Sequence, residues 1–269
     1  MKWSALECAS IRAWEEELSR LTINDLQLMK NKGEKIAAGV CYDVQMTKIW
    51  ERAGVDLLSV GDSVSRTFLG MEDDSEFSLD AMLLFGKAVA RVAQRAVVNV
   101  DMPNVTCNAG PKAVEEAAKR IKSETLADMT KVDIRTQEEE LFDDVLAVIG
   151  TGFPVYPQIG FDVWEPSHGS TKDFDHVMKW CNAVQDAGAV MIDLTNVSHE
   201  IYSAVANAIK VPVIGGQSGP EADGRIYVSY LLTGYRSDSI DKNDGTPSAA
   251  KYIYEIASDA VSKIHSGTW

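Results

Sequence analysis

The chain is poor in the residues that mark several large classes of protein. Its 269 residues include only four cysteines and four histidines, and 26 Lys and Arg face 40 Asp and Glu, which gives a formal net charge of -14. This negative charge disfavours nucleic acid and anionic membrane surfaces as partners, because their phosphates would be repelled. The cysteines are widely spaced and contain no CxxC pair, which fits a reduced protein better than a disulfide framework.

Long apolar runs and phosphate-binding glycine patterns are also missing. No stretch is long and apolar enough to span a membrane, and the first residues lack the apolar core of a signal peptide. No GxGxxG follows the first apolar run, which argues against a dinucleotide-binding doubly wound sheet. These absences predict a soluble, cytoplasmic protein without a membrane or nucleic-acid partner.

Short runs rich in Val and Leu alternate with amphipathic segments along most of the chain. We expect strands at 36–41, 56–60, 96–100, 128–132, 154–159, 189–193 and 211–215, with a further short apolar run at 226–232. We expect helices at 44–53, 78–94, 111–124, 136–149, 171–187, 198–209 and 247–265. Regular βα order over this length favours a closed (β/α)8 barrel in the α/β class.

An additional helical layer precedes the barrel. The amphipathic pattern at 12–30 is broken near 22–25, where Thr22 or Asn24 can cap a second helix. We therefore expect one domain over residues 1–269, with helices at 1–34 and the barrel at 35–269.

Three apolar runs each end at an aspartate, namely Asp62, Asp101 and Asp133. The carboxyl ends of parallel strands meet on one face of a barrel, where ligands bind, so three acids arriving there predict a site for a hard divalent cation, with Mg²⁺ first. The alternative for each residue alone is that its side chain caps the following helix or loop.

Two of these aspartates belong to a pattern that resembles the ketopantoate hydroxymethyltransferase family of the phosphoenolpyruvate mutase/isocitrate lyase superfamily. The pattern is Gly61-Asp62-Ser63 followed by Asp101-Met102-Pro103. The resemblance covers about 190 residues and includes segments around Tyr42-Asp43, Ala127-Asp128-Met129-Thr130-Lys131-Val132-Asp133, Gly188-Ala189 and Val211-Pro212-Val213-Ile214-Gly215.

The resemblance implies a set of site residues. By position, Asp62 and Asp101 carry Mg²⁺, and Asp133, one methylene shorter than the Glu usual in the family, acts on the metal through water. Ser63, beside Gly61, and Lys131 contact the carboxylate of a small 2-oxo acid. The alternatives from the residues alone are that Ser63 caps a helix or turn and that Lys131 pairs with Asp133.

Two departures concern the acid and base groups of the family. Gln158 stands where the family has a His, and Thr195 stands where it has the Glu that takes the proton from C3 of the oxo acid. A Thr hydroxyl cannot accept a proton at neutral pH without its own activating base. Gln158 can still orient the keto oxygen through a hydrogen bond. Candidates for the missing base are Asp193, Glu165, His168 and His199.

The resemblance implies a metal-dependent transferase or aldolase that makes or breaks a carbon-carbon bond of a 2-oxo acid through a metal-stabilised enolate. It also implies a homo-oligomer, decameric in the family, and it leaves open a tetrahydrofolate derivative as one-carbon donor. Alternatives are another superfamily lyase, hydrolase or decarboxylase, or a binding protein without turnover. The turn Gly215-Gly216-Gln217-Ser218-Gly219 is either an anion-binding loop or simply a tight turn.

Overall fold

Eight parallel strands form the centre of this computed structural model, which describes residues 19–163, 165 and 169–268. The strands are β1 (Ile36–Val40), β2 (Leu57–Val60), β3 (Val97–Asp101), β4 (Met129–Asp133), β5 (Val155–Gly160), β6 (Ile192–Thr195), β7 (Val213–Ile214) and β8 (Gly224–Val228). They follow one another in the sheet in sequence order from β1 to β7, with β8 beside β1.

Backbone hydrogen bonds between the segments of β7 and β8 bring the two ends of this sheet together. The Asp223 amide donates to the Val213 carbonyl at 3.1 Å, and the Ile226 amide donates to the Gly215 carbonyl at 3.3 Å. The expected (β/α)8 barrel is confirmed. All carboxyl ends of the strands therefore open onto one face, which is where barrels of this kind bind ligands.

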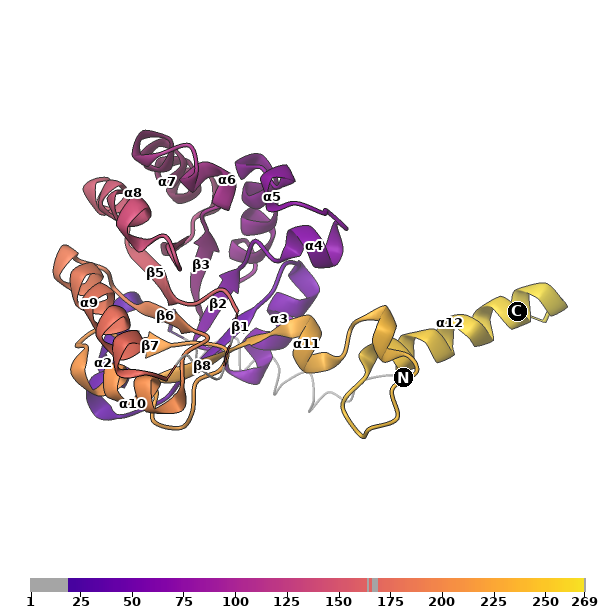
Figure 1. The fold of residues 1–269 in the computed structure, drawn as a ribbon. Coiled ribbons are helices and arrows are strands. Elements are labelled where there is room, and N and C mark those ends of the chain that lie inside the picture. The colour runs from indigo at the N-terminus through magenta and orange to yellow at the C-terminus, as the bar shows by residue number, and fades with distance from the viewer. Residues whose placement is uncertain (1–18, 164, 166–168, 269) are drawn as a thin grey trace. The chain divides into compact units, whose positions relative to one another are not determined.

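The long helices lie outside the strands of the barrel (Figure 1). They are α2 (Ile23–Lys32), α3 (Val44–Ala53), α5 (Leu79–Ala90), α7 (Pro111–Thr125), α8 (Glu138–Gly150), α9 (Thr171–Ala187) and α10 (His199–Ala208). The short helices α4 (Val64–Phe68) and α6 (Asn104–Cys107), which follow β2 and β3, were not expected from the sequence. They are too short for a helical period to be visible in the apolar pattern.

Side-chain caps explain where several of these helices begin. Thr22, and not Asn24, caps α2 through a capping box with Asp25. The Asp43 side chain accepts hydrogen bonds from the first amides of α3. The part of the expected N-terminal layer before residue 19 lies outside the described residues.

Aspartates at the amino-terminal ends of strands satisfy backbone amides of the neighbouring strands. Asp56 accepts from the Ala37 amide at 2.9 Å, Asp128 from the Val98 amide at 2.8 Å and Asp223 from the Val213 amide at 2.8 Å. Each of these acids directly precedes a strand, so it lies on the face of the barrel opposite the one that binds ligands. Their role is to accept hydrogen bonds from backbone amides that would otherwise lack acceptors at the strand ends.

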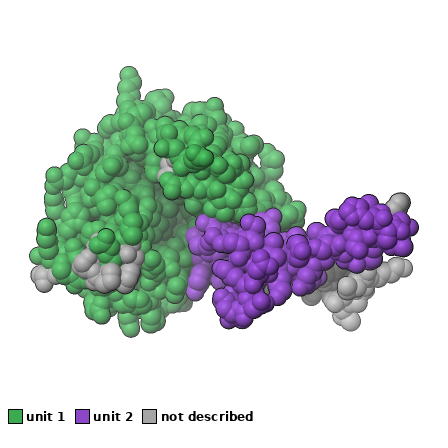
Figure 2. Space-filling model, turned by 45° about the vertical axis from the view of Figure 1, so that its right-hand side comes forward, with its two compact units in different colours: residues 1–226 green, residues 227–269 purple. Residues whose placement is uncertain are grey.

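The chain divides into two compact units, residues 1–226 and 227–269 (Figure 2). The second unit contains α11 (Ser229–Thr233) and the 18-residue helix α12 (Ala249–Ser266). Along α12, the side chains of Ile253, Ile256 and Ile264 are exposed. Among the described residues, no helix is long and apolar enough to cross a membrane.

Candidate functional site

The alternation of side chains along β4 places Lys131, Asp133 and Arg135 on one face, while Val132 and Ile134 are fully buried on the other. The amide of Ile134 continues the ladder by donating to the Gln158 carbonyl at 3.1 Å. Salt bridges from Lys131 to acids of β3 and β6 show that this face is the inside of the barrel.

Asp101 lies at the centre of a buried polar cluster at the end of β3. Its side chain is almost fully buried, and its Oδ2 forms an ion pair with the Nζ of Lys131 at 2.9 Å. Its Oδ1 accepts hydrogen bonds from the amide of Asn99 at 2.6 Å and from the hydroxyl of Ser59 at 3.4 Å. These contacts fix the carboxylate inside the barrel, and it does not cap a helix.

The pKa of Asp101 reveals a second carboxylate close by. This pKa is raised to about 6, because burial and the negative charge of Asp62, which raise it, outweigh the positive charge of Lys131, which lowers it. Asp62 also acts on the pKa of Lys131. The first two of the predicted metal-binding acids therefore belong to one electrostatic cluster.

Lys131 is shared between two carboxylates of the inner face. Besides Asp101, its Nζ contacts the Oδ2 of Asp193 at 3.4 Å. Burial opposes the charge of Lys131, but the carboxylates of Asp101 and Asp193 raise its pKa above the ordinary value, so the ammonium stays protonated. The alternative that Lys131 pairs with Asp133 is wrong.

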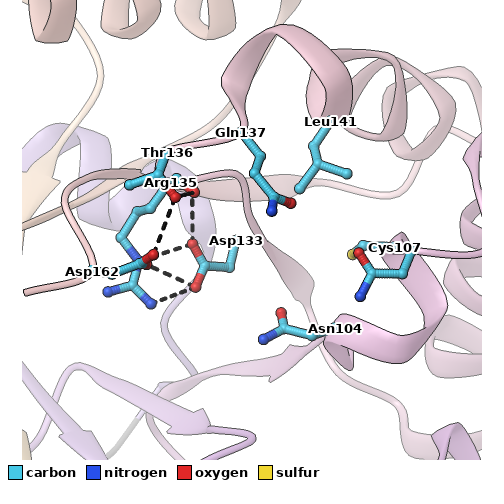
Figure 3. A pocket seen from close by; sticks show the side chains of 9 residues that line it. Asn104, Cys107, Asp133, Arg135, Thr136, Gln137, Leu141 and Asp162 are labelled. Carbon is cyan, nitrogen blue, oxygen red and sulfur yellow. Dashed lines mark hydrogen bonds and ion pairs between the residues drawn. The ribbon is translucent and has the colours of Figure 1, made fainter. Parts of the chain in front are cut away.

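Asp133 is paired with Arg135 instead (Figure 3). The Nε of Arg135 donates to Asp133 Oδ1 at 2.9 Å and its Nη2 donates to Asp133 Oδ2, which forms a forked ion pair. In the described part of the chain, no group of three His, Cys, Asp or Glu side chains is arranged to hold a metal ion. Two carboxylates nevertheless fit Mg²⁺, which usually keeps several waters and takes further oxygens from its substrate.

Ser63 lies at the first residue before α4, but its hydroxyl makes no capping hydrogen bond to that helix. It instead forms a 2.7 Å hydrogen bond with the phenol of Tyr42. The capping alternative for Ser63 is therefore wrong. Gly61 lies beside both groups, because a Cβ built on it would be 3.5 Å from the Ser63 hydroxyl and 3.6 Å from Asp101 Oδ2.

Gln158 and Thr195, the two residues predicted to depart from the family pattern, contact each other. The Nε2 of Gln158 donates to the Thr195 hydroxyl at 2.9 Å, and this hydroxyl donates to Asp193 Oδ1 at 3.3 Å. Asp193 is buried, and burial raises its pKa while Lys131 and Arg135 lower it. A carboxylate thus lies one hydrogen bond from Thr195, the residue that the resemblance aligns with the base of the family.

The remaining candidates from the sequence lie on loops and at a helix start. Glu165 is exposed on the loop after β5, and His168 lies outside the described residues. His199 is the first residue of α10, beside Gly219.

In the glycine-rich turn after β7, Gly215 is required by packing, since a Cβ there would be 1.9 Å from the hydroxyl oxygen of Tyr202.

Tyr42, Asn99 and Arg135 join the cluster without having been selected from the sequence as site residues. Asn99 and Arg135 each lie two residues from a predicted metal-binding aspartate, Asp101 and Asp133 respectively. Since side chains two positions apart on a strand share a face, this spacing could have identified Asn99 and Arg135 as site residues from the sequence. Tyr42 lies on the loop after β1, and only the folded chain brings it to Ser63.

Comparison with known proteins decides the family. A family model described as ketopantoate hydroxymethyltransferase matches residues 20–263. The chain belongs to this family. It is 32% identical over 216 residues to the 3-methyl-2-oxobutanoate hydroxymethyltransferase of Acidothermus cellulolyticus, covering 78% of this chain and 79% of that one. It is 28% identical to the enzyme of the same name from Cytophaga hutchinsonii, with 83% and 84% covered.

Solved structures share the fold at low sequence identity. A phosphonopyruvate hydrolase in complex with oxalate and Mg²⁺ aligns with a TM-score of 0.59 at 14% identity, covering 93% of this chain and 99% of that one. A 2,3-dimethylmalate lyase of the PEP mutase/isocitrate lyase superfamily aligns with a TM-score of 0.58 at 16% identity, covering 77% and 81%. The likeness shows that this chain shares its barrel fold with these proteins.

Proposed function

We propose that this family member is a divalent-metal-dependent enzyme that makes or breaks a carbon-carbon bond of a small 2-oxo acid, by aldol-type chemistry. The observation that carries the proposal is the buried cluster of Asp101 and Lys131, with the Asp62 charge beside it, at the carboxyl end of the strands. Both the resemblance in sequence and the family match support hydroxymethyl transfer as the reaction.

Asp62 and Asp101 are the residues that would hold the cation, with Asp133 acting on it through water. Mg²⁺ is the first choice, because carboxylate, water and substrate oxygens are its usual ligands. When bound, such an ion withdraws electrons from the keto carbon and stabilises the charge of an enolate. Asn99 and Lys131 keep the Asp101 carboxylate in one orientation, which keeps that ligand in place before the metal binds.

The carboxylate of the substrate would bind next to Gly61, Ser63 and Lys131. The Ser63 hydroxyl is oriented by Tyr42, and Gly61 leaves room for a ligand beside Asp101. The charge of Lys131 compensates the two carboxylates that it contacts, which lowers the repulsion that an incoming anion would meet.

We propose that Asp193 receives the proton, with the Thr195 hydroxyl as relay and the Gln158 amide positioning that hydroxyl. A buried carboxylate with a raised pKa is a better general base at neutral pH than an exposed one. Glu165, on the loop after β5, and His168 stay candidates for a contact with substrate.

The test offers the purified protein a series of 2-oxo acids with Mg²⁺, each with and without formaldehyde or a methylene-tetrahydrofolate derivative. A new adduct supports hydroxymethyl transfer, and release of a smaller oxo acid without an aldehyde supports cleavage. Binding without product at any pH would leave a non-catalytic protein that binds metal and oxo acid, and would contradict the proposal.

Changing the metal-binding acids tests the same proposal at the residue level. Asp62→Ala and Asp101→Ala should each abolish activity and its dependence on divalent ions, while circular dichroism shows a folded barrel. The matched control is Asp43→Ala, which removes an acid that caps α3 and lies outside the buried cluster of Asp62, Asp101 and Lys131. Full activity in either of the first two variants would rule out the metal site.

Cleavage is a second candidate function, favoured by the contact between Gln158 and Thr195. A hydroxyl relay is well suited to taking a proton from an O–H group of the substrate. In that reaction the substrate proton passes to Thr195 while the Thr195 proton passes to Asp193. The carbon-carbon bond then breaks, its electron pair stays with the oxo-acid fragment, and an aldehyde leaves.

We propose a cytoplasmic homo-oligomer, decameric by analogy with the family, because an 18-residue helix with exposed isoleucines suits burial against another copy. The acidic surface fits a small substrate and disfavours nucleic acid.

A further inference from the structure

Arg135, two residues after the end of β4, is a cation that the proposed chemistry does not use. It lies one side-chain repeat beyond Asp133, and the side chain is 19% exposed. Burial opposes its charge, while the carboxylates of Asp133, Asp162 and Asp193 raise its pKa. Because Asp193 acts on both Arg135 and Lys131, the guanidinium belongs to the same electrostatic neighbourhood as the proposed base.

The hydrogen bonds of Arg135 fill one of its two binding edges and leave only a long contact at the nitrogens of the other. Asp133 takes the edge formed by Nε and Nη2, and the Phe161 carbonyl accepts from Nη1 at a long 3.5 Å. A guanidinium has five N–H donors, and Nη1 and Nη2 together form a second fork at its end. Within the described residues, each of these terminal nitrogens keeps an N–H without an acceptor.

The backbone next to Arg135 is strained. The next residue, Thr136, is β-branched and has φ of 60°, in the left-handed region that such residues rarely adopt. Its hydroxyl bonds to the Arg135 carbonyl at 2.7 Å and to Asp162 Oδ2 at 3.1 Å. Strain of this kind persists where surrounding contacts overdetermine it, and it concentrates at functional sites.

A polar cavity of about 170 Å³ adjoins the pair of Arg135 and Asp133 (Figure 3). Its lining includes Asn104, Asn108 and Gln137, whose amides can donate hydrogen bonds. The cavity thus offers room and neutral donors beside the only guanidinium among its described lining residues.

We propose that the terminal nitrogens of Arg135 bind a second carboxylate of the substrate, so that the preferred substrate is a 2-oxo acid with two carboxylates. The inference rests on the proposed function, because the first carboxylate and the keto group bind at the metal side. A planar carboxylate matches a guanidinium fork with two parallel hydrogen bonds. Asp133 is then a positioning residue, since it fixes the guanidinium through the opposite edge.

The charges of the site are compatible with such a dianion. Four acids and two cations act on one another's pKa here: Asp62, Asp101, Asp133 and Asp193 against Lys131 and Arg135. A divalent cation would bring their formal sum to zero, so that the site no longer repels an anion. The bidentate contact with Arg135 then supplies selectivity.

The experiment compares two acids of equal chain length, 2-oxopentanoate and 2-oxoglutarate, which differ by a methyl and a carboxylate at the far end. Calorimetry in the presence of Mg²⁺ should give a dissociation constant 10- to 100-fold lower for 2-oxoglutarate. Arg135→Met should remove this preference and leave the binding of 2-oxopentanoate within about twofold. Arg91→Met, which removes an exposed positive charge after α5, should leave both values unchanged.

Equal affinity of the wild type for the two acids would overturn the inference, as would an equal loss for both in Arg135→Met. If Arg135→Met does not fold, Arg135→Lys decides: it keeps the charge without the fork and should still lose most of the preference. Failure of both acids to bind with Mg²⁺ would instead refute the proposed function, and this inference with it.

Discussion

At the scale of single residues, the partners of a buried carboxylate determine its role. Asp56, Asp128 and Asp223 accept backbone amides at the amino-terminal ends of strands and have a structural role. Asp101 at the opposite end faces an ammonium ion and a second acid, which is an arrangement that suits a metal and an anionic substrate. Both kinds of acid lie next to a strand. The structural acids lie at its amino-terminal end, and the site acids lie at its carboxyl end.

The predicted departure from the family at Thr195 can be tested by a single substitution. Thr195→Glu would place a carboxylate where the resemblance predicts the base of the family, and we expect it to produce deuterium exchange at C3 of 2-oxoisovalerate in the presence of Mg²⁺. Proton NMR of the substrate measures this exchange, with Thr195→Gln as the uncharged control. No gain would mean that the surrounding pocket, including Gln158, excludes this substrate geometry.

Asp144 on α8 is buried with no hydrogen-bond partner for either oxygen among the described residues. Burial raises its pKa to about 6 from an ordinary value of 3.8. The folded state therefore binds the proton more tightly than the unfolded state, and stability falls as the pH rises from about 4 through about 6. The free energy of unfolding should drop by about 2 to 3 kcal/mol over this range from this group alone.

Asp144→Asn removes this charge and should make the protein more stable than the wild type at pH 8, with little difference at pH 4. Urea unfolding at the two pH values measures the effect. The matched control is Glu140→Gln, an exposed position on the same helix, which should change stability at neither pH. A wild-type advantage at pH 8 would mean that Asp144 has a favourable partner.

At the scale of secondary-structure elements, the junction of β6, β7 and α10 depends on one glycine. A Cβ on Gly215 would be 2.1 Å from the Leu194 carbonyl oxygen and 1.9 Å from the Tyr202 hydroxyl, which itself donates to that carbonyl at 2.6 Å. Gly215 thus serves the packing of a strand against a helix. The glycine-rich turn requires no anion to account for this residue.

Gly215→Ala should therefore destabilise the fold by about 3 kcal/mol or prevent folding, because backbone atoms cannot move aside. Gly216→Ala is the matched control in the same turn, where the nearest atom to a new Cβ is 3.7 Å away. Thermal unfolding of the two variants gives the comparison. Equal melting temperatures would show that the turn shifts freely.

At the scale of the whole molecule, we expect α12 to be the helix through which copies of the chain associate. Ile253, Ile256 and Ile264 recur at helical spacing and are all exposed. We expect light scattering to give a mass several times 29.4 kDa for the wild type. Ile256→Glu together with Ile264→Glu should reduce this mass, whereas Ser258→Glu, placed on the other side of the helix, should not. A monomeric wild type would contradict the expectation.

The longer elements were predictable because their periodicity is local. The helices at 44–53 and 171–187 were predicted with the boundaries that the structure has. The strand expected at 189–193 begins only at Ile192, since Ala189 and Met191 are buried without belonging to the sheet ladder. Burial produces the same apolar pattern in a strand and in the loop before it, so the sequence cannot mark that boundary.

By itself, the sequence determined the barrel, the family and the three aspartates at strand ends, because periodicity and spacing along the chain carry this information. Only the tertiary structure decided the pairs. It joined Lys131 to Asp193, Asp133 to Arg135 and Gln158 to Thr195. The physical reason is that an ion pair or hydrogen bond depends on distances of about 3 Å. Those distances are set by strand register and barrel closure, to which many distant residues contribute together.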